Sequence, residues 1–257
     1  MTDLIRFSFP LSPRMQTFLQ LRDGLSCLAE AEREQQAFKW LQACADVRIS
    51  LSGEQGRRPA LPEVLGLLVS MQTHLKSLAE KHPRFRDKIM GSCEALGQHA
   101  QTLRNGMDET LRWLASDALI EAWLNALKKH DWLGHQRNML QSLPALWQST
   151  DRRNHLHDHL QGLSEAVRCL HAMLHDYVEW QRRLATEGSD QILPDRGTQF
   201  GLVIVGLAPK QVKAGVIPDI SGNRLTIRIR FQSWLPGQAA MPMQEDVPYH
   251  AMLVPIA

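Results

Sequence analysis

The stretch Val216-Ile-Pro-Asp-Ile-Ser-Gly-Asn-Arg-Leu-Thr-Ile-Arg-Ile-Arg-Phe231 places a Ser-Gly-Asn step between two apolar runs. A Gly-Asn pair in that position is typical of a β-hairpin. From residue 224 onward, apolar and polar residues alternate with the two-residue period of a strand. The alternation predicts a core face made of Leu225, Ile227, Ile229 and Phe231, and a polar face made of Arg224, Thr226, Arg228 and Arg230.

The polar face of this predicted strand carries three arginines. Like charges repel one another, so the stripe costs free energy unless an acidic partner meets it. The alternative is a solvated outer face whose charges only keep the sheet soluble. The pattern of residues leaves both interpretations open.

Length and composition indicate a soluble globular protein. The 257 residues can form one large domain or two small ones. Hydrophobic residues make up 44% of the chain and charged residues 22%, which argues against disorder. The net charge of +2 is lower than that of a general nucleic-acid binder, so any basic function must be local.

Targeting signals are not apparent in the sequence. The N-terminal residues include neither a basic leader nor the apolar core of a signal peptide. No apolar run approaches the roughly 18 residues that span a bilayer. The four cysteines are too irregularly spaced for a zinc site or a disulfide framework. We therefore expect a cytoplasmic protein with reduced cysteines, no metal, no cofactor and no membrane partner.

Helical periodicity dominates the chain after its first ten residues. Ser12-Pro13 is a helix-start signal, and further helices are expected at about 30–47, 59–79, 85–103 and 107–128. Segment 132–147 fits either a helix or a strand. Residues 4–9 alternate like a strand that has no neighbour nearby in the sequence, so we expect this strand to pair with a C-terminal sheet.

A regular apolar repeat follows in the next segment. Its members recur at steps of four and three, which is typical of a heptad seam: Leu156, Leu160, Leu163, Val167, Leu170, Leu174, Tyr177 and Leu184. The seam could line a bundle core within the chain or form a dimer contact. The lack of consistent charge pairing beside it favours the bundle core. Gly188 is expected to end this helix.

Composition changes after residue 188 toward Val, Ile, Gly and Pro. Strands are expected at 200–205 and 249–254, in addition to the arginine-bearing hairpin. We therefore predict an α+β protein, with a helical domain at 11–188 and a small antiparallel β-rich domain at 189–257. The N-terminal strand at 4–9 should complete the sheet of the second domain.

One histidine cluster, His155-Leu-His-Asp-His159, could carry catalytic chemistry. His155 and His159 are four residues apart, a spacing that can hold a metal on one helix face. His157 points elsewhere, and no Glu or Cys completes a familiar ligand set. His171 and His175 repeat the spacing and meet the same objection. Because the sequence contains no Walker loop, dinucleotide fingerprint or Gly-x-Ser-x-Gly elbow, we expect no catalytic residues and no enzyme activity.

A second basic feature, Arg57-Arg58, precedes Pro59 at a predicted helix start. Cations at the positive end of a helix dipole are mildly unfavourable. The pair serves either solubility or a second contact with an acidic partner.

Three segments together resemble the ZapD family of Z-ring-associated cell division proteins. Phe7-Ser-Phe-Pro-Leu-Ser-Pro-Arg-Met-Gln-Thr-Phe-Leu19 is similar to the family's N-terminus, where an aromatic-rich strand and Pro-Leu precede a helix. Residues Ile217–Phe231 are similar to the family's Ile-Ser-Gly hairpin and Arg-Phe strand. Leu143-Pro-Ala-Leu146 is similar to a shorter internal motif. The order and spacing match across essentially the whole chain, with weaker similarity in the middle helices.

Members of this family are cytoplasmic bacterial proteins with a helical domain and a β-rich domain, and they form homodimers. They bind the C-terminal tail of the tubulin-like division protein FtsZ, largely through basic residues, and cross-link FtsZ filaments into bundles. The resemblance therefore implies a non-enzymatic cell division factor that promotes Z-ring assembly and septation at midcell.

The resemblance also implies which residues contact the FtsZ tail. Arg230 matches the family's strand arginine before Phe, and Arg224 stands where a basic residue follows the Ser-Gly turn. Arg58, with its neighbour Arg57, falls in the basic stretch ahead of the third helix.

The chain departs from the family's pattern at three positions. The family has Arg where this chain has Gln16 and Gln20, so we expect no tail contact from the first helix. The family also has Arg near Thr226, and Arg228 can compensate because it lies two residues along on the same predicted face. The residues alone leave two other functions open, a nucleic-acid-binding module that uses strand 224–230 and a metal-dependent hydrolase that uses the cluster 155–159.

Overall fold

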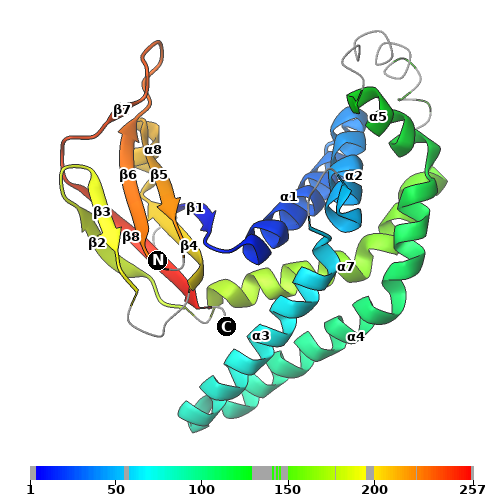
Figure 1. The fold of residues 1–257 in the computed structure, drawn as a ribbon, viewed down its shortest axis with the longest axis horizontal. Helices are drawn as coiled ribbons and strands as arrows, with labels where there is room; N and C mark the ends of the chain where they lie inside the picture. The colour runs from blue at the N-terminus through cyan, green and yellow to red at the C-terminus, as the bar shows by residue number, and fades with distance from the viewer. Residues whose placement is uncertain are drawn as a thin grey trace. The chain divides into compact units, whose positions relative to one another are not determined.

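The computed structural model describes residues 4–54, 58–128, 150–176, 178–194, 200–223 and 225–255, together with residues 141, 143 and 145. The chain divides into two compact units, one formed by residues 17–171 and the other by residues 1–16 and 172–257. The first unit is helical, and the described strands belong to the second (Figure 1). The α+β class predicted from the sequence is confirmed.

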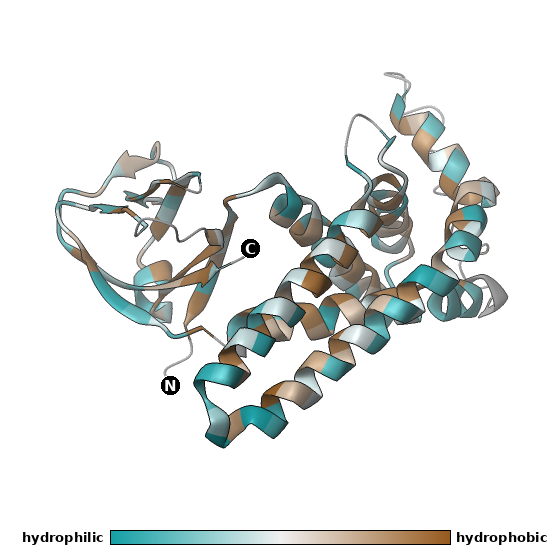
Figure 2. Cartoon of the chain, turned by 60° about the horizontal axis from the view of Figure 1, so that its bottom comes forward, coloured by the Kyte–Doolittle hydropathy of each residue, from teal (hydrophilic) through white to brown (hydrophobic). Residues whose placement is uncertain are grey.

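The helices up to Lys128 follow one another with short connections, and residues 129–149 lie between Lys128 and the helix that begins at Thr150. In chain order they are α1 (Pro13–Arg33), α2 (Ala37–Ser52), α3 (Ala60–Lys81), the short 3-10 helix η2 (Pro83–Phe85), α4 (Arg86–Ser116), α5 (Ala118–Lys128) and α7 (Thr150–Asp176). Helices α3 and α4 lie side by side over much of their length (Figure 1). Hydrophobic and hydrophilic residues are interspersed along the helices in Figure 2, as expected of helices that bury one stripe.

The helix starts follow the local signals in the sequence better than the helix lengths do. The Ser12 hydroxyl accepts a hydrogen bond from the backbone N–H of Met15 at 3.2 Å, so it caps α1 as predicted. Helix α1 runs past the expected break at residue 30, and α4 is continuous across 103–107. Asp117 starts α5, because its Oδ1 accepts from the N–H groups of Leu119 and Ile120 at 3.0 Å. Most of the ambiguous segment 132–147 lies outside the described residues.

The heptad seam is buried by the chain itself over its helical part. Six of its members are at most 2% exposed: Leu156, Leu160, Leu163, Val167, Leu170 and Leu174. This favours the bundle-core interpretation. The predicted continuation of the seam is wrong, because α7 ends at Asp176 and Leu184 lies on a strand with 53% of its surface exposed. Tyr177 lies outside the described residues.

Two antiparallel sheets form the second unit. One has the strand order β1 (Ile5–Pro10), β4 (Phe200–Leu207), β8 (Val247–Pro255) and β2 (Gln181–Ala185). The other has the order β3 (Ser189–Ile192), β6 (Ile227–Ser233) and β5 (Val216–Gly222), and the short β7 (Met241–Pro242) also pairs with β6. The short helix α8 (Pro209–Lys213) lies between β4 and β5 in the chain. The pairing of β1 with β4 confirms that the N-terminal strand completes the C-terminal sheet.

The change from helix to strand comes earlier than the expected boundary at 188/189. Strand β2 lies within the segment expected to be helical, and it pairs with β8. Gly188 does not end a helix. It has a φ of +71° in the turn between β2 and β3, and its carbonyl accepts from the N–H of Phe231 at 2.8 Å. A glycine is suited to this turn because a left-handed backbone costs it little.

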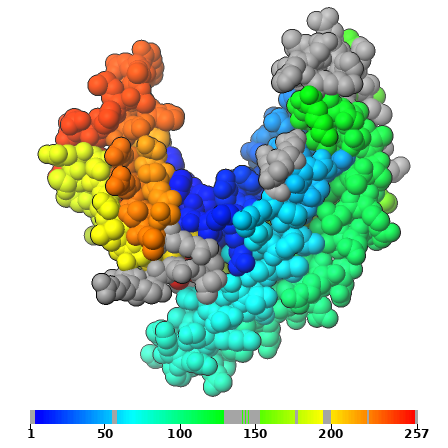
Figure 3. Space-filling view, viewed as in Figure 1, coloured from blue at the N-terminus to red at the C-terminus, as the bar shows by residue number. Residues whose placement is uncertain are grey.

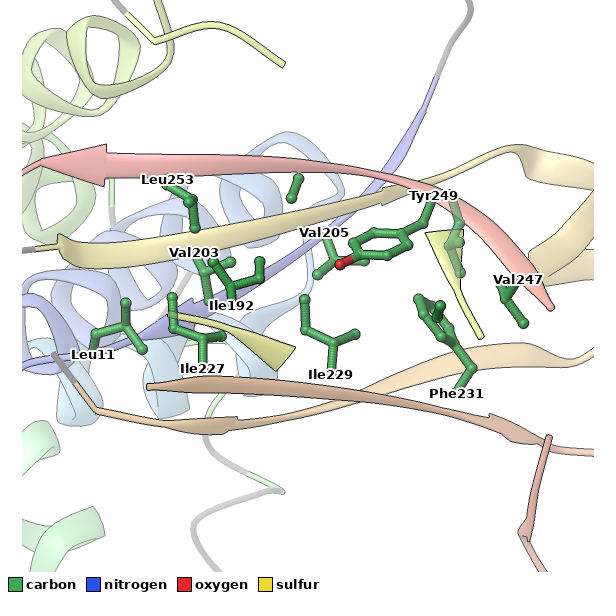
Figure 4. Packing of buried hydrophobic residues seen from close by; sticks show 13 residues of the cluster. Leu11, Ile192, Val203, Val205, Ile227, Ile229, Phe231, Val247, Tyr249 and Leu253 are labelled. Carbon is green, nitrogen blue, oxygen red and sulfur yellow. The ribbon is translucent and has the colours of Figure 1, made fainter. Parts of the chain in front are cut away.

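The inner faces of the two sheets enclose one apolar core (Figure 4). Side chains from both sheets meet there, and the following are at most 2% exposed: Val203, Val205, Tyr249, Ile227, Ile229 and Phe231. The rings of Phe231 and Tyr249 lie 5.3 Å apart between centroids. Full burial of such side chains stabilises the fold by about 1.5–3 kcal/mol each, so this core sets the positions of the strands around it.

One polar network crosses the same core. Asp190 on β3 accepts hydrogen bonds at Oδ2 from Arg183 Nε on β2 at 2.8 Å and from the Tyr249 hydroxyl on β8 at 2.6 Å. Arg183 Nη2 donates to Asp190 Oδ1 at 3.3 Å. Burial by itself raises the pKa of Asp190, but the hydrogen bonds from Arg183 and Tyr249 outweigh it and hold that pKa below its ordinary value. The network therefore joins strands of both sheets through an ionised carboxylate.

We expect Asp190→Asn to lower the free energy of unfolding near neutral pH by about 1–3 kcal/mol, because an amide pairs less strongly with Arg183 than a carboxylate does. The pKa of Asp190 is lower in the folded state, so its stabilisation is complete above about pH 4 and is lost as the pH falls further. Urea unfolding of both proteins should show a stability gap that narrows below about pH 4. If the two proteins differed in unfolding free energy by the same amount near neutral pH and below about pH 4, the result would contradict an ionised Asp190.

Candidate functional site

Two arginines lie on the outer face of β6, opposite the core. Ile227, Ile229 and Phe231 are at most 1% exposed, whereas Arg228 and Arg230 between them are exposed. The predicted alternation is therefore present from Ile227 onward. The two guanidinium groups therefore project from a strand whose opposite face is packed into the core.

The register places polar residues beside each of these arginines. Arg228 is opposite Gln191 on β3 and Ser221 on β5. Arg230 is likewise opposite Ser189 and Asp219. Within the described residues, no carboxylate oxygen lies within 4 Å of either guanidinium. The arginines are therefore available to an external acidic group, although the exposed Asp219 reduces the positive potential near Arg230.

The hairpin loop next to this face differs from the prediction. Strand β5 extends to Gly222, which pairs with Ile227, so the loop is longer than the expected Ser-Gly-Asn step. The Asn223 side chain stabilises the loop conformation, because its Oδ1 accepts hydrogen bonds from the N–H groups of Leu225 at 2.8 Å and Thr226 at 3.2 Å. Such a side-chain turn competes with strand pairing.

Leu225 is accordingly not a core residue. It is 79% exposed in the loop, which corrects its predicted place on the buried face. Thr226 accepts a hydrogen bond from the Gln191 amide at 3.2 Å, so it too is held in the loop next to β6. Arg224 lies outside the described residues.

The second predicted basic feature belongs to the helical unit. Arg57 lies outside the described residues. Arg58 is 65% exposed ahead of α3, and its Nη1 lies 3.7 Å from Glu63 Oε1. Glu63 is in the first turn of α3, where a carboxylate is favoured by the helix dipole. Because the Arg58 end of this 3.7 Å ion pair is exposed, the pair stabilises little, although Glu63 itself is only 17% exposed. Arg58 can therefore exchange Glu63 for another carboxylate.

The histidine cluster packs against an aromatic ring. The rings of His155 and His159 lie 5.1 Å apart, and the Trp113 ring lies 6.1 Å from the first and 5.6 Å from the second, between centroids. His157 faces a groove between α1 and α7 instead. Within residues 4–54, 58–128 and the other described segments, no group of three His, Cys, Asp or Glu side chains is placed to hold a metal.

The groove between α1 and α7 has a volume of about 650 Å³ and a mixed lining that includes Arg22, His171 and Glu165. Arg22 Nη1 lies 2.7 Å from His171 Nε2. Because a guanidinium can only donate, this nitrogen of His171 is the acceptor and carries no proton. It is therefore engaged with Arg22 and is not placed to activate a serine in this groove.

No protein-family model matches the chain, and no curated protein matches it at a significant level. None of the helices in the described part of the chain combines the length and the apolar character that a membrane span requires. The candidate site is the outer face of β6 with Arg228 and Arg230. In the absence of a matching family model or curated protein, this choice is based on the geometry of the face alone.

We expect Gly222→Ala to destabilise the hairpin that carries this site. Gly222 has a φ of +151°, and a Cβ there would lie 2.4 Å from the carbonyl oxygen of Thr226. The change should lower the free energy of unfolding by about 1–3 kcal/mol, measured by urea unfolding. Gly106→Ala is the matched control, because Gly106 is inside α4 with nothing within 4 Å of a new Cβ. The control should be neutral or up to about 1 kcal/mol more stable. Equal unfolding midpoints for both variants would contradict a strained position at 222.

Proposed function

We propose that this protein is a cell division factor of the ZapD kind, which binds the C-terminal tail of FtsZ and cross-links FtsZ filaments into bundles at midcell. The observation that carries the proposal is the pair of exposed guanidinium groups of Arg228 and Arg230, without a carboxylate within 4 Å among the described residues. The resemblance of Ile217–Phe231 to the family's tail-binding hairpin supports it. Arg224, Arg57 and Arg58 are proposed as further contacts.

The fold of β6 suits this role physically. A peptide that binds to a rigid strand does not have to order the receptor as well, so less conformational entropy is lost on binding. Charge-assisted hydrogen bonds from arginine to a carboxylate contribute about 1.5–3 kcal/mol each. Two such contacts give a single site of modest affinity, which favours a partner that presents many copies of its tail along a filament.

Filament bundling requires at least two sites in one particle. A homodimer with two-fold symmetry carries two equal sites, and this geometry alone allows it to bridge filaments. Because the helical part of the heptad seam is already buried by the chain, we propose that the dimer contact uses another surface. In this proposal the protein acts in the cytoplasm without cofactor, catalysis, nucleic acid or membrane.

The two alternative functions have less support. The neighbouring strands place Gln191, Ser189, Ser221 and Asp219 beside Arg228 and Arg230, and among the described residues no aromatic ring lies between the two arginines to stack on bases. His155 and His159 pack against Trp113, which accounts for their positions without a metal.

We expect the double substitution Arg228→Glu and Arg230→Glu to abolish the bundling of polymerised FtsZ, measured by sedimentation. Each side chain is exposed, so its loss leaves no cavity, and the repulsion between the new Glu at 230 and Asp219 opposite it should lower the melting temperature only slightly. Loss of two contacts should weaken one site at least about a hundredfold, at about 1.4 kcal/mol per tenfold. FtsZ that lacks its tail should not respond to the wild-type protein, and wild-type bundling should fade at several hundred millimolar salt.

The matched control is Arg84→Glu with Arg86→Glu. These arginines are also exposed and two residues apart, and they belong to the helical unit. The control makes the same change in net charge, so it should bundle FtsZ like the wild type. If the Arg228/Arg230 variant keeps its melting temperature and still bundles normally, the basic face is only a solvated surface.

We also expect a homodimer at micromolar concentration, because one tail site per monomer cannot bridge two filaments. Light scattering should give about twice the chain mass of 29.2 kDa. A monomer that still bundles FtsZ would require a second tail site within one chain instead.

A further inference from the structure

The outer face of β6 continues beyond the two arginines to an exposed tryptophan. Side chains two residues apart share a face of a strand, so Arg228, Arg230, Gln232 and Trp234 form one row. The N–H of Trp234 donates to the carbonyl of Gly215 at 2.8 Å, which extends the β5–β6 pairing by one residue. Trp234 is 57% exposed. The row therefore passes from cationic to aromatic along one strand.

The end of the row near Trp234 has apolar residues on both sides of Gln232. Gln232 is opposite Ile217 on β5 and Pro242 on β7. The Trp234 indole N–H donates to Gln232 Oε1 at 3.1 Å, which orients the ring over this end. Residues 233–243 include no charged side chain, and the connection from β6 to β7 projects from the end of the β unit (Figure 3). This end of the face contrasts with the polar end around Arg228.

We propose that Trp234, with Ile217 and Pro242, forms an apolar subsite for the same extended peptide whose acidic residues bind Arg228 and Arg230. The inference rests on the proposed function for the identity of that peptide, but it predicts the peptide's pattern independently. At about 3.3 Å per residue, the two arginines are spaced for carboxylates two positions apart. The subsite extends from Ile217 and Pro242, which lie opposite Gln232 about 7 Å beyond Arg230, to Trp234 at about 13 Å. The matching peptide carries an apolar side chain up to four positions from its nearer acidic residue, where it meets the indole ring.

A peptide fits this face better than a nucleic acid does. A nucleic-acid strand carries a phosphate at every nucleotide, and one of these would meet the carboxylate of the exposed Asp219 beside Arg230. A peptide can place a neutral residue at that position. A single aromatic side chain also offers one stacking partner at the end of the row, whereas an aliphatic or aromatic peptide residue needs only one contact to be buried there.

The test is fluorescence anisotropy with the full-length protein and labelled synthetic peptides. One peptide carries two aspartates two positions apart and a leucine four positions beyond, in a Ser background. A second has the reverse order, because the face does not define the direction of the chain. Each has a counterpart with Ser in place of Leu. A peptide of the FtsZ C-terminal tail and an oligothymidylate of about 12 nucleotides complete the set.

We expect one of the leucine peptides to bind the wild-type protein about tenfold more tightly than its serine counterpart. Trp234→Ala should remove this difference, because the leucine then has no ring to contact. Raising the salt should weaken both peptides through the arginine contacts but leave their ratio unchanged. Phe85→Ala is the matched control: Phe85 is 60% exposed in the helical unit, and its removal should keep the ratio. Melting temperatures of both variants should equal that of the wild type.

Three outcomes would overturn the subsite. The leucine and serine peptides could bind the wild type equally well, the Trp234→Ala variant could keep the wild-type preference for leucine, or no leucine peptide could bind up to about 1 mM. Tighter binding of the oligothymidylate than of every peptide, lost in Trp234→Ala, would assign the face to nucleic acid instead. The FtsZ tail peptide separates this inference from the proposed function. If it binds equally well to the wild type and Trp234→Ala, only the subsite fails. If it does not bind while the leucine peptide does, only the FtsZ assignment fails.

Discussion

The burial of Ile227, Ile229 and Phe231 between the two sheets is the constraint on which the candidate site depends. Side chains alternate between faces of a strand, so a shift of β6 by one residue would bury Arg228 and Arg230 and expose all three apolar residues. Exposing them would forfeit about 1.5–3 kcal/mol each, and burying unpaired guanidinium groups would cost more. The core therefore holds the register in which both arginines face outward.

The pairing partners of β6 are held by a different kind of interaction. Strand β3 lies beside the arginine row, and its Asp190 is tied to Arg183 and to the hydroxyl of Tyr249. A partly buried carboxylate needs its donors, so this network fixes the place of β3 against β2 and β8 of the other sheet more narrowly than apolar contacts do. Burial and the neighbouring carboxylate also raise the pKa of Tyr249, so its hydroxyl stays protonated and remains a donor. Ser189 and Gln191 take their places beside the arginines as a consequence.

The sequence alone predicts those features that depend on local period and local capping. The alternation from Ile227 to Phe231 predicts the exposed arginines, and Ser12 predicts the start of α1. The sequence does not predict strand β2. Leu184 continues the heptad spacing of the preceding helix, and the strand is stabilised by pairing with β8, which is distant in the sequence. Leu225 continues the strand alternation in the same way, but its N–H and that of Thr226 donate to the Asn223 side-chain oxygen in the loop instead of pairing with a neighbouring strand. The place of Trp234 in the arginine row is not predicted from local patterns, because it depends on the backbone contact with Gly215.

In the proposed complex, the arginines of β6 and the tryptophan that follows the strand have different roles in recognition. Two guanidinium groups attract any acidic segment over about a Debye length, which speeds encounter but discriminates poorly between partners. Contact with an indole acts only at van der Waals distance and does not weaken with salt, so it rejects acidic segments that lack an apolar residue at the right spacing. Because the net charge of the chain is only +2, long-range attraction here is weak and local. In the proposed complex, selectivity therefore comes from the spacing between the charged and apolar ends of this face, which is set by β6 and by the backbone contact of Trp234 with Gly215.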